Sequence, residues 1–189
     1  VIYNATNLSR KRRVAFASEM RKYFDAIKIV CCLCSVEMLY ERNKTRKERH
    51  LPEAKLTQMI KTIQLPNIHE FKYDDIIFYD TDSSQELEKD KLENLMTYEQ
   101  NNKNHSETLG NHIVRVIKEC ENDNIAQVVA LYHDLGKPFC REVWEDGYAH
   151  YRNHNIVSSL YYALDCLRTK GKIYQGDYDI LLMIEFHDY

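Results

Sequence analysis

The sharpest chemical feature of the sequence is the pair His133-Asp134, at the end of the apolar segment ALYHDLGKP. Burying an imidazole or a carboxylate without a partner is costly. A divalent cation removes that cost, because both groups are good metal ligands. Adjacent residues on a helix point about 100° apart. The two side chains therefore suit one ion approached from two sides, or an Asp134 carboxylate that bridges two ions.

Three further histidines surround this pair in the sequence, each beside an apolar stripe. His112 lies upstream of the pair, and His154 and His187 lie downstream. Lys137 follows Gly136, which lets the preceding helix end, and it places a cation where a phosphate could bind. An ordered set of this kind is far more specific than a single His-Asp dipeptide. The set predicts that the imidazoles converge around a metal ion.

The elements that must position these residues are helices. Apolar side chains recur at helical spacing within 109–120, 125–135 and 156–167, and one more helix begins at Asp179. Residues 105–189 therefore predict an all-α domain whose core is shared by several helices.

Residues 1–80 predict a different architecture. The expected elements are the end of a buried strand at 1–3, a helix at 9–24, a central strand at 26–35, helices at 36–43 and from 52, and a strand at 75–79. This alternation is typical of an α/β fold. A capping box at Ser83 predicts a charged helix that reaches Tyr98. We therefore expect three regions: a partial α/β region at 1–80, a helical and polar linker at 81–104, and the helical domain at 105–189.

Composition excludes some functions and favours others. The five glycines all follow residue 109, so the chain carries neither a Walker A loop nor a dinucleotide-binding fingerprint. Residues 1–60 carry 13 basic and 6 acidic side chains, whereas the remainder carries 13 and 23. The basic part predicts a phosphate-bearing partner. No apolar run reaches the roughly 18 residues of a membrane span. We expect a cytoplasmic protein with reduced thiols, and we interpret the chain as a piece of a longer protein.

With their surroundings, the histidines resemble the HD-domain superfamily of metal-dependent phosphohydrolases. The matching segments are HIVRV from His112, ALYHDLGKP, HNIVSS from His154 and EFHDY around His187. The resemblance covers 105–189 and implies an all-α fold with one or two metal ions that activate water against a phosphoester. The implied metal ligands are His112, His133, Asp134, His154 and His187. The implied ion is divalent, with Mn, Mg, Fe, Ni, Co and Zn all compatible.

The same resemblance gives roles to residues near the ligands. Asp134 and Lys137 are the expected catalytic residues. The expected contacts to substrate phosphate are Lys137, Arg152, His105 and His150, and His150 is also an alternative to His154 as a ligand. The family usually closes its site with an aspartate on a further helix. Asp188 is expected to lie too close to His187 to take that place.

The first region resembles the later portion of P-loop kinases of the polynucleotide-kinase type. The matching segments are NATNLSRKRR, ERNKTRKERHLPEAKLTQM and DDIIFYD. Arg42, Arg46 and Arg49 have the spacing of one helical face, and the resemblance implies that they form a lid on ATP phosphates. It also places the basic run 10–13 near the acceptor. Without a Walker A loop, kinase activity is not expected of this chain, and ATP binding is expected only of the full-length protein.

Together, the two resemblances indicate a bifunctional polynucleotide kinase/phosphoesterase that acts on RNA or DNA ends. An alternative is an HD phosphohydrolase that acts on small nucleotides, with the first region as a docking surface. Another alternative is a non-catalytic nucleic-acid-binding module. The sequence predicts neither the oligomeric state nor the choice between RNA and DNA.

Overall fold

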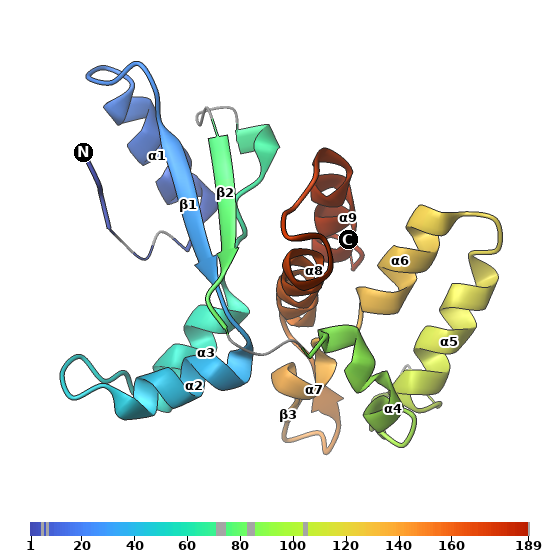
Figure 1. Cartoon of the computed structure of the whole chain (residues 1–189). Coiled ribbons are helices and arrows are strands. Elements are labelled where there is room, and N and C mark those ends of the chain that lie inside the picture. Colours follow the sequence, from blue (N-terminus) through green and yellow to red (C-terminus); the bar gives the residue numbers. More distant parts are fainter. Residues whose placement is uncertain (5, 7, 71–74, 83–85, 104–105, 189) are drawn as a thin grey trace. The chain divides into compact units, whose positions relative to one another are not determined.

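The computed structural model divides the chain into two compact units, Val1–Asp82 and Ser83–Tyr189 (Figure 1). It describes all residues except 5, 7, 71–74, 83–85, 104–105 and 189. Each unit is considered on its own below. Among the described residues, no helix combines the length and apolar character needed to cross a membrane.

The first unit is built on a parallel strand pair with a helical crossover. Its elements are α1 (Arg10–Met20), β1 (Lys28–Leu33), α2 (Val36–Thr45), α3 (Glu53–Lys61), η1 (Ile68–Glu70) and β2 (Asp75–Asp80). Strands β1 and β2 pair in parallel, from Lys28 opposite Asp75 to Leu33 opposite Asp80. Ser9 caps α1 by accepting a hydrogen bond from the backbone N–H of Arg12. The α/β pattern expected of this region is therefore present.

Two details of the expected α/β region are wrong. Residues 1–3 form no strand, and their side chains are exposed, with Tyr3 stacked on Phe16 at a centroid distance of 4.3 Å. The central strand expected at 26–35 is shorter and only half-buried: Val30 is 55% exposed. A strand buries alternate residues when only one of its faces is covered. Hydropathy alone does not distinguish this case from burial on both faces.

A buried ion pair holds α1 to the segment before β2. Arg13 is 2% exposed and meets the Glu70 carboxylate through two nitrogens, with Nε 3.1 Å from Oε2 and Nη2 2.5 Å from Oε1. Its Nη1 also donates to the carbonyl oxygens of Gln64 and Leu8, at 2.6 and 3.4 Å. The guanidinium of Arg13 is thus used within the fold, although the kinase resemblance places the basic run near an acceptor.

Arg13→Ala is expected to lower the free energy of unfolding of the first unit by about 3–5 kcal/mol, because it leaves the Glu70 charge buried without its partner. Arg12→Ala is the matched control, since Arg12 is exposed on the same helix. Urea denaturation of the two variants measures the difference. Equal midpoints for the two variants would contradict this account of the pair.

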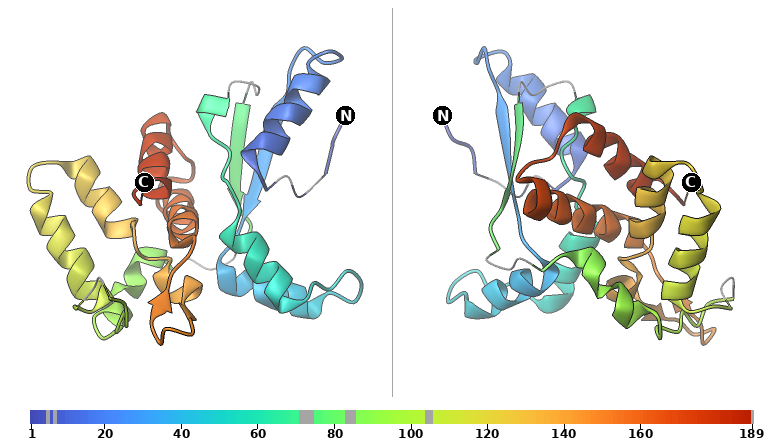
Figure 2. Two further views of the ribbon diagram at one scale, coloured as in Figure 1. Left: turned by 180° about the vertical axis from the view of Figure 1, so that it is seen from behind. Right: turned by 45° about the vertical axis from the view of Figure 1, so that its right-hand side comes forward.

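The second unit is mainly helical. Its elements are η2 (Glu88–Lys91), α4 (Leu92–Leu95), α5 (Leu109–Glu119), α6 (Asn124–Tyr132), α7 (Lys137–Cys140), β3 (Glu142–Val143), β4 (Ala149–His150), α8 (His154–Lys170) and α9 (Gln175–Glu185). Helices α5 and α6 lie side by side, as do α8 and α9 (Figure 2). The expectation of an all-α domain misses one feature, since β3 and β4 form a short antiparallel hairpin.

Helix α8 is the centre of the second unit's core. Its buried side chains include Val157, Leu160 and Leu164. The buried carboxylate of Asp165 accepts hydrogen bonds from the backbone N–H groups of Glu88 and Lys89 and from the Tyr132 hydroxyl. The core thereby includes η2, which belongs to the part of the chain expected to be a linker.

The charged helix expected to extend from Ser83 to Tyr98 is replaced by η2 and α4, which together span only 88–95. Ser83 itself lies outside the described residues. Short helices depend on packing more than on propensity. In this segment, the hydrogen bonds that backbone N–H groups at the start of η2 donate to Asp165 supply that contact.

Candidate metal centre

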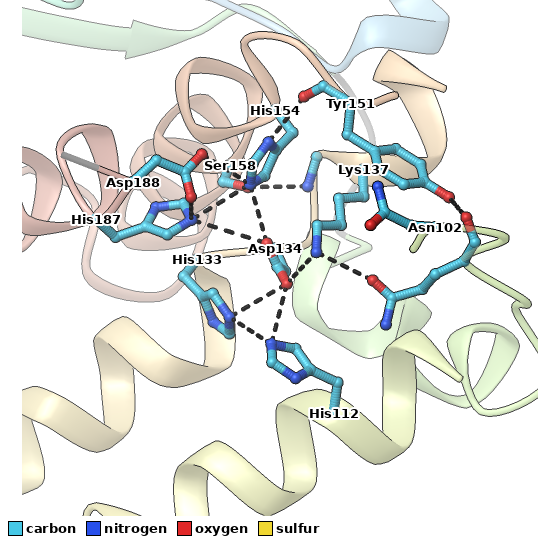
Figure 3. Close-up of polar contacts among 12 residues, drawn as sticks. Asn102, His112, His133, Asp134, Lys137, Tyr151, His154, Ser158, His187 and Asp188 are labelled. Atoms are coloured by element: carbon cyan, nitrogen blue, oxygen red, sulfur yellow. Dashed lines mark hydrogen bonds and ion pairs between the residues drawn. The ribbon is translucent and has the colours of Figure 1, made fainter. Parts of the chain in front are cut away.

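Four helices place the candidate ligands around one point. His112 lies in the first turn of α5, and His133 is the C-terminal cap of α6. His154 is the first residue of α8, and His187 follows the end of α9. From these positions the four imidazoles point toward the carboxylate of Asp134 (Figure 3). The convergence that the sequence predicts for these five residues is therefore present in the structure.

A close backbone contact brings Asp134 up to the start of α8. The N–H of Gly136 donates to Ser158 Oγ at 2.9 Å. A Cβ atom at Gly136 would lie 2.2 Å from the carbonyl oxygen of His154, far inside contact distance. Glycine permits this approach because it has no side chain. Helix α6 already ends at Tyr132, so Gly136 does not terminate it as the sequence predicts. Gly136 is instead the N-terminal cap of α7, and its close approach to His154 fixes how near Asp134 lies to that ring.

Asp134 lies between two pairs of histidines and is 2% exposed. Its Oδ2 lies 3.2 Å from Nε2 of His112 and 3.2 Å from Nε2 of His133. Its Oδ1 lies 2.9 Å from Nε2 of His154 and 3.8 Å from Nε2 of His187. The ligand atoms form two groups that could each hold a metal ion, one on each side of the shared carboxylate.

Backbone carbonyls determine which nitrogen carries the proton on three of the four rings. In each case Nδ1 lies close to the carbonyl oxygen three residues earlier: His133 to Ala130 at 2.7 Å, His154 to Tyr151 at 2.8 Å, and His187 to Ile184 at 2.7 Å. A carbonyl only accepts hydrogen bonds, so each Nδ1 carries a hydrogen, and Nε2 of the neutral ring is a bare acceptor.

The bare nitrogens explain why the cluster fits a cation. The Nε2 atoms of His154 and His187 lie 3.3 Å apart, so in the neutral rings two lone pairs face each other. A metal ion bound by both nitrogens turns this repulsion into coordination. Neutral imidazole and ionised carboxylate are also the ligand types that divalent first-row metals accept. The donor set therefore fits a divalent metal ion.

The electrostatics of the cluster agree with this chemistry. Burial raises the pKa of Asp134, but the four facing histidine rings, which donate hydrogen bonds to the carboxylate whenever Nε2 is protonated, outweigh burial and hold that pKa well below its usual value. Burial lowers the pKa of His187, but its hydrogen bonds with Asp134 and with the Ile184 carbonyl raise it overall. Asp134 is therefore an ionised carboxylate in a site that attracts positive charge.

Lys137 is part of the same buried network. Its Nζ lies 2.7 Å from Oδ2 of Asp134 and 3.0 Å from Oε1 of Gln100, and the residue is 5% exposed. The sequence predicts Lys137 as a phosphate contact, and the structure adds that its ammonium group already neutralises the central carboxylate. The buried Gln100 is a member of the network that the sequence analysis missed.

Asp188 is a second residue that the sequence analysis missed. Its Oδ1 lies 3.3 Å from Nε2 of His187, and its Oδ2 lies 3.5 Å from Nε2 of His154. The sequence analysis expected Asp188 to lie too close to His187 to serve as the closing aspartate of the site. Helix α9 ends at Glu185, and beyond it the side chains of His187 and Asp188 both turn toward the cluster.

A family model described as an AAA domain matches residues 1–66. This family is P-loop kinase-like, in agreement with the kinase resemblance of the first region. No curated protein and no solved structure matches the chain. The case for the second unit therefore depends on its own residues and geometry.

The three lid arginines of the kinase-like region do not share a helical face, so that expectation is wrong. Helix α2 contains Arg42 in its last turn and ends at Thr45, before the other two. Arg46 has extended backbone with ψ of 122°, and Arg49 has a φ of 61°. Their spacing along the sequence therefore does not place the guanidinium groups together.

The side chain of Asn43 explains why α2 ends early. Its amide donates to the carbonyl oxygen of Leu51 at 2.8 Å and accepts from the N–H of Leu51 at 3.0 Å. These two bonds close a loop over the intervening residues. Arg42 itself donates to the hydroxyl and carbonyl oxygens of Thr81, the first of these at 2.8 Å. The helical spacing of residues in a sequence does not predict such a loop closure.

The structure places two predicted phosphate contacts on the β3–β4 hairpin and its continuation. His150 stacks on Trp144 at 3.7 Å between ring centroids, and its Nε2 lies 3.3 Å from Oδ2 of Asp146. The guanidinium of Arg152 lies 4.3 Å from the centroid of the same tryptophan. The alternative of His150 as a ligand finds no support, because His154 is the histidine beside Asp134. The remaining candidate, His105, lies outside the described residues.

Proposed function

We propose that the second unit is a metal-dependent phosphohydrolase of the HD type. Its divalent ion or ions are held by His112, His133, Asp134, His154 and His187. In the whole protein, this activity works beside the kinase-like region on nucleic-acid ends. The observation that carries the proposal is the central carboxylate of Asp134, whose two oxygens each face a different pair of imidazoles.

The residues around the centre have distinct tasks in this proposal. A divalent cation supplies Lewis acidity, which makes hydroxide available from water near neutral pH. Asp134 presents one oxygen to each histidine pair, and Lys137 offsets negative charge that develops on the phosphate. Asp188 adds a carboxylate at the exposed side of the His154–His187 pair. In the neutral rings of His133, His154 and His187, backbone carbonyls hold the proton on Nδ1 and so leave Nε2 available to a metal ion.

The proposed substrate is a phosphoester at a nucleic-acid end. The AAA-domain match and the excess of basic residues in 1–60 both support a partner that carries phosphates. An oligonucleotide with a terminal or cyclic phosphate is expected to be hydrolysed in preference to a free nucleotide. A competition assay between the two measures this preference. Preference for the free nucleotide would contradict the proposed nucleic-acid substrate, but it would not contradict the proposed metal-dependent hydrolysis.

His154→Ala is expected to reduce the metal content and to abolish phosphoester hydrolysis, since His154 faces Oδ1 of Asp134 at 2.9 Å. His150→Ala is the matched control for metal content, because His150 is paired with an exposed carboxylate on the hairpin. Elemental analysis of the purified chain, after loading with Mn²⁺ and dialysis, measures the difference. Hydrolysis is then followed with each of Mn²⁺, Mg²⁺, Fe²⁺, Ni²⁺, Co²⁺ and Zn²⁺. Equal metal content in the two variants would contradict the proposal. Absence of phosphoester hydrolysis by the wild-type chain with any of the six ions would also contradict it.

A further inference from the structure

One of the four histidines differs from the others in what lies beside its second nitrogen. The Nδ1 atoms of three rings face backbone carbonyls, as described above. Nδ1 of His112 instead lies between two charged side chains, 3.4 Å from Oε1 of Glu107 and 3.1 Å from Nη2 of Arg115. Two side chains of opposite charge therefore compete for this nitrogen.

The two neighbours favour opposite tautomers of His112. A carboxylate accepts, so pairing with Glu107 puts the proton on Nδ1 and leaves Nε2 bare. A guanidinium only donates, so pairing with Arg115 leaves Nδ1 bare and puts the proton of the neutral ring on Nε2. Nε2 of His112 faces Asp134 and lies 3.2 Å from Nε2 of His133. Only the first tautomer lets His112 bind a cation there.

Glu107 also binds Arg115, the residue that competes with it for Nδ1 of His112. Arg115 donates to Oε1 of Glu107 from Nε at 3.0 Å and from Nη2 at 2.8 Å, and to Oε1 of Glu119 from Nη1 at 2.8 Å. The nitrogen that approaches His112 is therefore one that Glu107 already binds. Removing the Glu107 carboxylate would take away the acceptor for Nδ1 and would also release Nη2 to donate to the ring.

The position of Glu107 is fixed by the fold. Its carbonyl oxygen accepts a hydrogen bond from Nε2 of Gln100 at 3.1 Å, and Gln100 is 1% exposed. The next residue, Thr108, pairs with Glu99 in an isolated bridge and caps α5. The backbone of Glu107 is thus held just before the helix that carries His112, and its carboxylate lies beside the ring that it contacts.

We propose that Glu107 is a positioning residue that selects the metal-binding tautomer of His112 in competition with Arg115. This inference deepens the proposed function and rests on it for the identity of the ligand, a divalent cation. Removal of a carboxylate that accepts a hydrogen bond from the second nitrogen of a ligating histidine typically lowers metal affinity by about 10- to 100-fold. The half of the centre formed by His112 and His133 therefore depends on a side chain for one of its two rings, whereas both rings of the His154–His187 half are oriented by the main chain.

The test compares Glu107→Ala with Glu119→Ala in the full chain. Both variants remove one carboxylate partner of Arg115, but only Glu107 reaches the His112 ring. In calorimetric titrations with Mn²⁺, Glu107→Ala is expected to weaken binding by roughly 10- to 100-fold, and Glu119→Ala is expected to bind like the wild type. The double variant Glu107→Ala/Arg115→Met is expected to recover part of the lost affinity, because the competing donor is gone. A purely structural role for Glu107 predicts no such recovery.

Histidine ¹⁵N NMR of the metal-free protein tests the tautomer directly. We expect the His112 proton on Nδ1 in the wild type and in Glu119→Ala, and on Nε2 in Glu107→Ala. An unchanged tautomer in Glu107→Ala, or equal Mn²⁺ affinity of the two single variants, would overturn the inference. If the wild type binds no Mn²⁺, the proposed function fails, and the NMR measurement alone still decides whether Glu107 sets the tautomer.

Discussion

Asp134→Asn is expected to have the largest effect on function of any single change in the chain. The substitution keeps the shape of the side chain but removes the charge that faces four imidazoles and the Lys137 ammonium group. We expect the metal content of the purified protein to be lost. We also expect phosphoester hydrolysis to fall by at least about 10²- to 10³-fold, the size of effect that follows the loss of one preorganised electrostatic contact in other enzymes.

The same substitution is expected to destabilise the second unit without metal. It leaves Lys137, which is 5% exposed, without an ionised partner. Breaking a buried ion pair from one side costs about 3–5 kcal/mol. Denaturation of the metal-free protein therefore separates this loss of stability from the loss of metal. Lys137→Met together with Asp134→Asn is expected to recover stability but not metal binding.

Asp146→Asn is the matched control for Asp134→Asn. Asp146 also pairs with a histidine and a lysine, with Oδ2 3.3 Å from Nε2 of His150 and 3.9 Å from Nζ of Lys103. Its side chain is 38% exposed, however, and surface pairs of this kind contribute little. Metal content and stability are expected to stay at wild-type levels in this variant. Full metal content in Asp134→Asn would be incompatible with a shared carboxylate at the centre.

The sequence was sufficient to predict that these side chains converge, because their positions follow from helical geometry. His112, His133 and His154 each adjoin an apolar stripe, and an apolar stripe faces the core that its neighbours share. Side chains next to such stripes at the ends of packed helices therefore converge. This reasoning needs only the helical period and a common core, and the structure supplies both.

The same reasoning failed where a helix ends. The spacing of Arg42, Arg46 and Arg49 predicts one face only if α2 continues, and Asn43 closes the loop that stops it. Asp188 was set aside because it lies next to His187 in the sequence, yet α9 ends at Glu185 and the Asp188 carboxylate reaches both His154 and His187. Helix ends depend on side-chain contacts between distant residues, and periodicity contains no information about them.

Residues that act by orienting a candidate ligand could also not be predicted from the sequence. Glu107 and Gln100 lie in a polar segment that carries no period, and their contacts to His112 and Lys137 depend on how that segment folds back. A bridge between Glu99 and Thr108 produces this fold. The sequence pattern alone indicated the candidate ligands, whereas the residues that orient them could be identified only from the structure.

Gly136→Ala is expected to have the largest effect on the stability of the second unit among the glycine substitutions. An added Cβ would lie 2.2 Å from the His154 carbonyl oxygen and 2.9 Å from the backbone nitrogen of Ser158, and neither atom belongs to a flexible side chain. The φ of Gly136 is −75°, which alanine adopts freely. The whole effect therefore comes from the close approach of two backbones.

Overpacking of this kind typically costs about 1–3 kcal/mol, and here the strain separates Asp134 from His154. We therefore expect Gly136→Ala to lower both the unfolding midpoint and the affinity for Mn²⁺. Gly176→Ala is the matched control, because a Cβ there meets no atom within 4 Å and the residue lies in α9. It is expected to stabilise the unit by about 0.5–1 kcal/mol through helix propensity. If Gly136→Ala were as stable as Gly176→Ala and bound Mn²⁺ equally well, the turn after His133 could not be what sets the spacing of the centre.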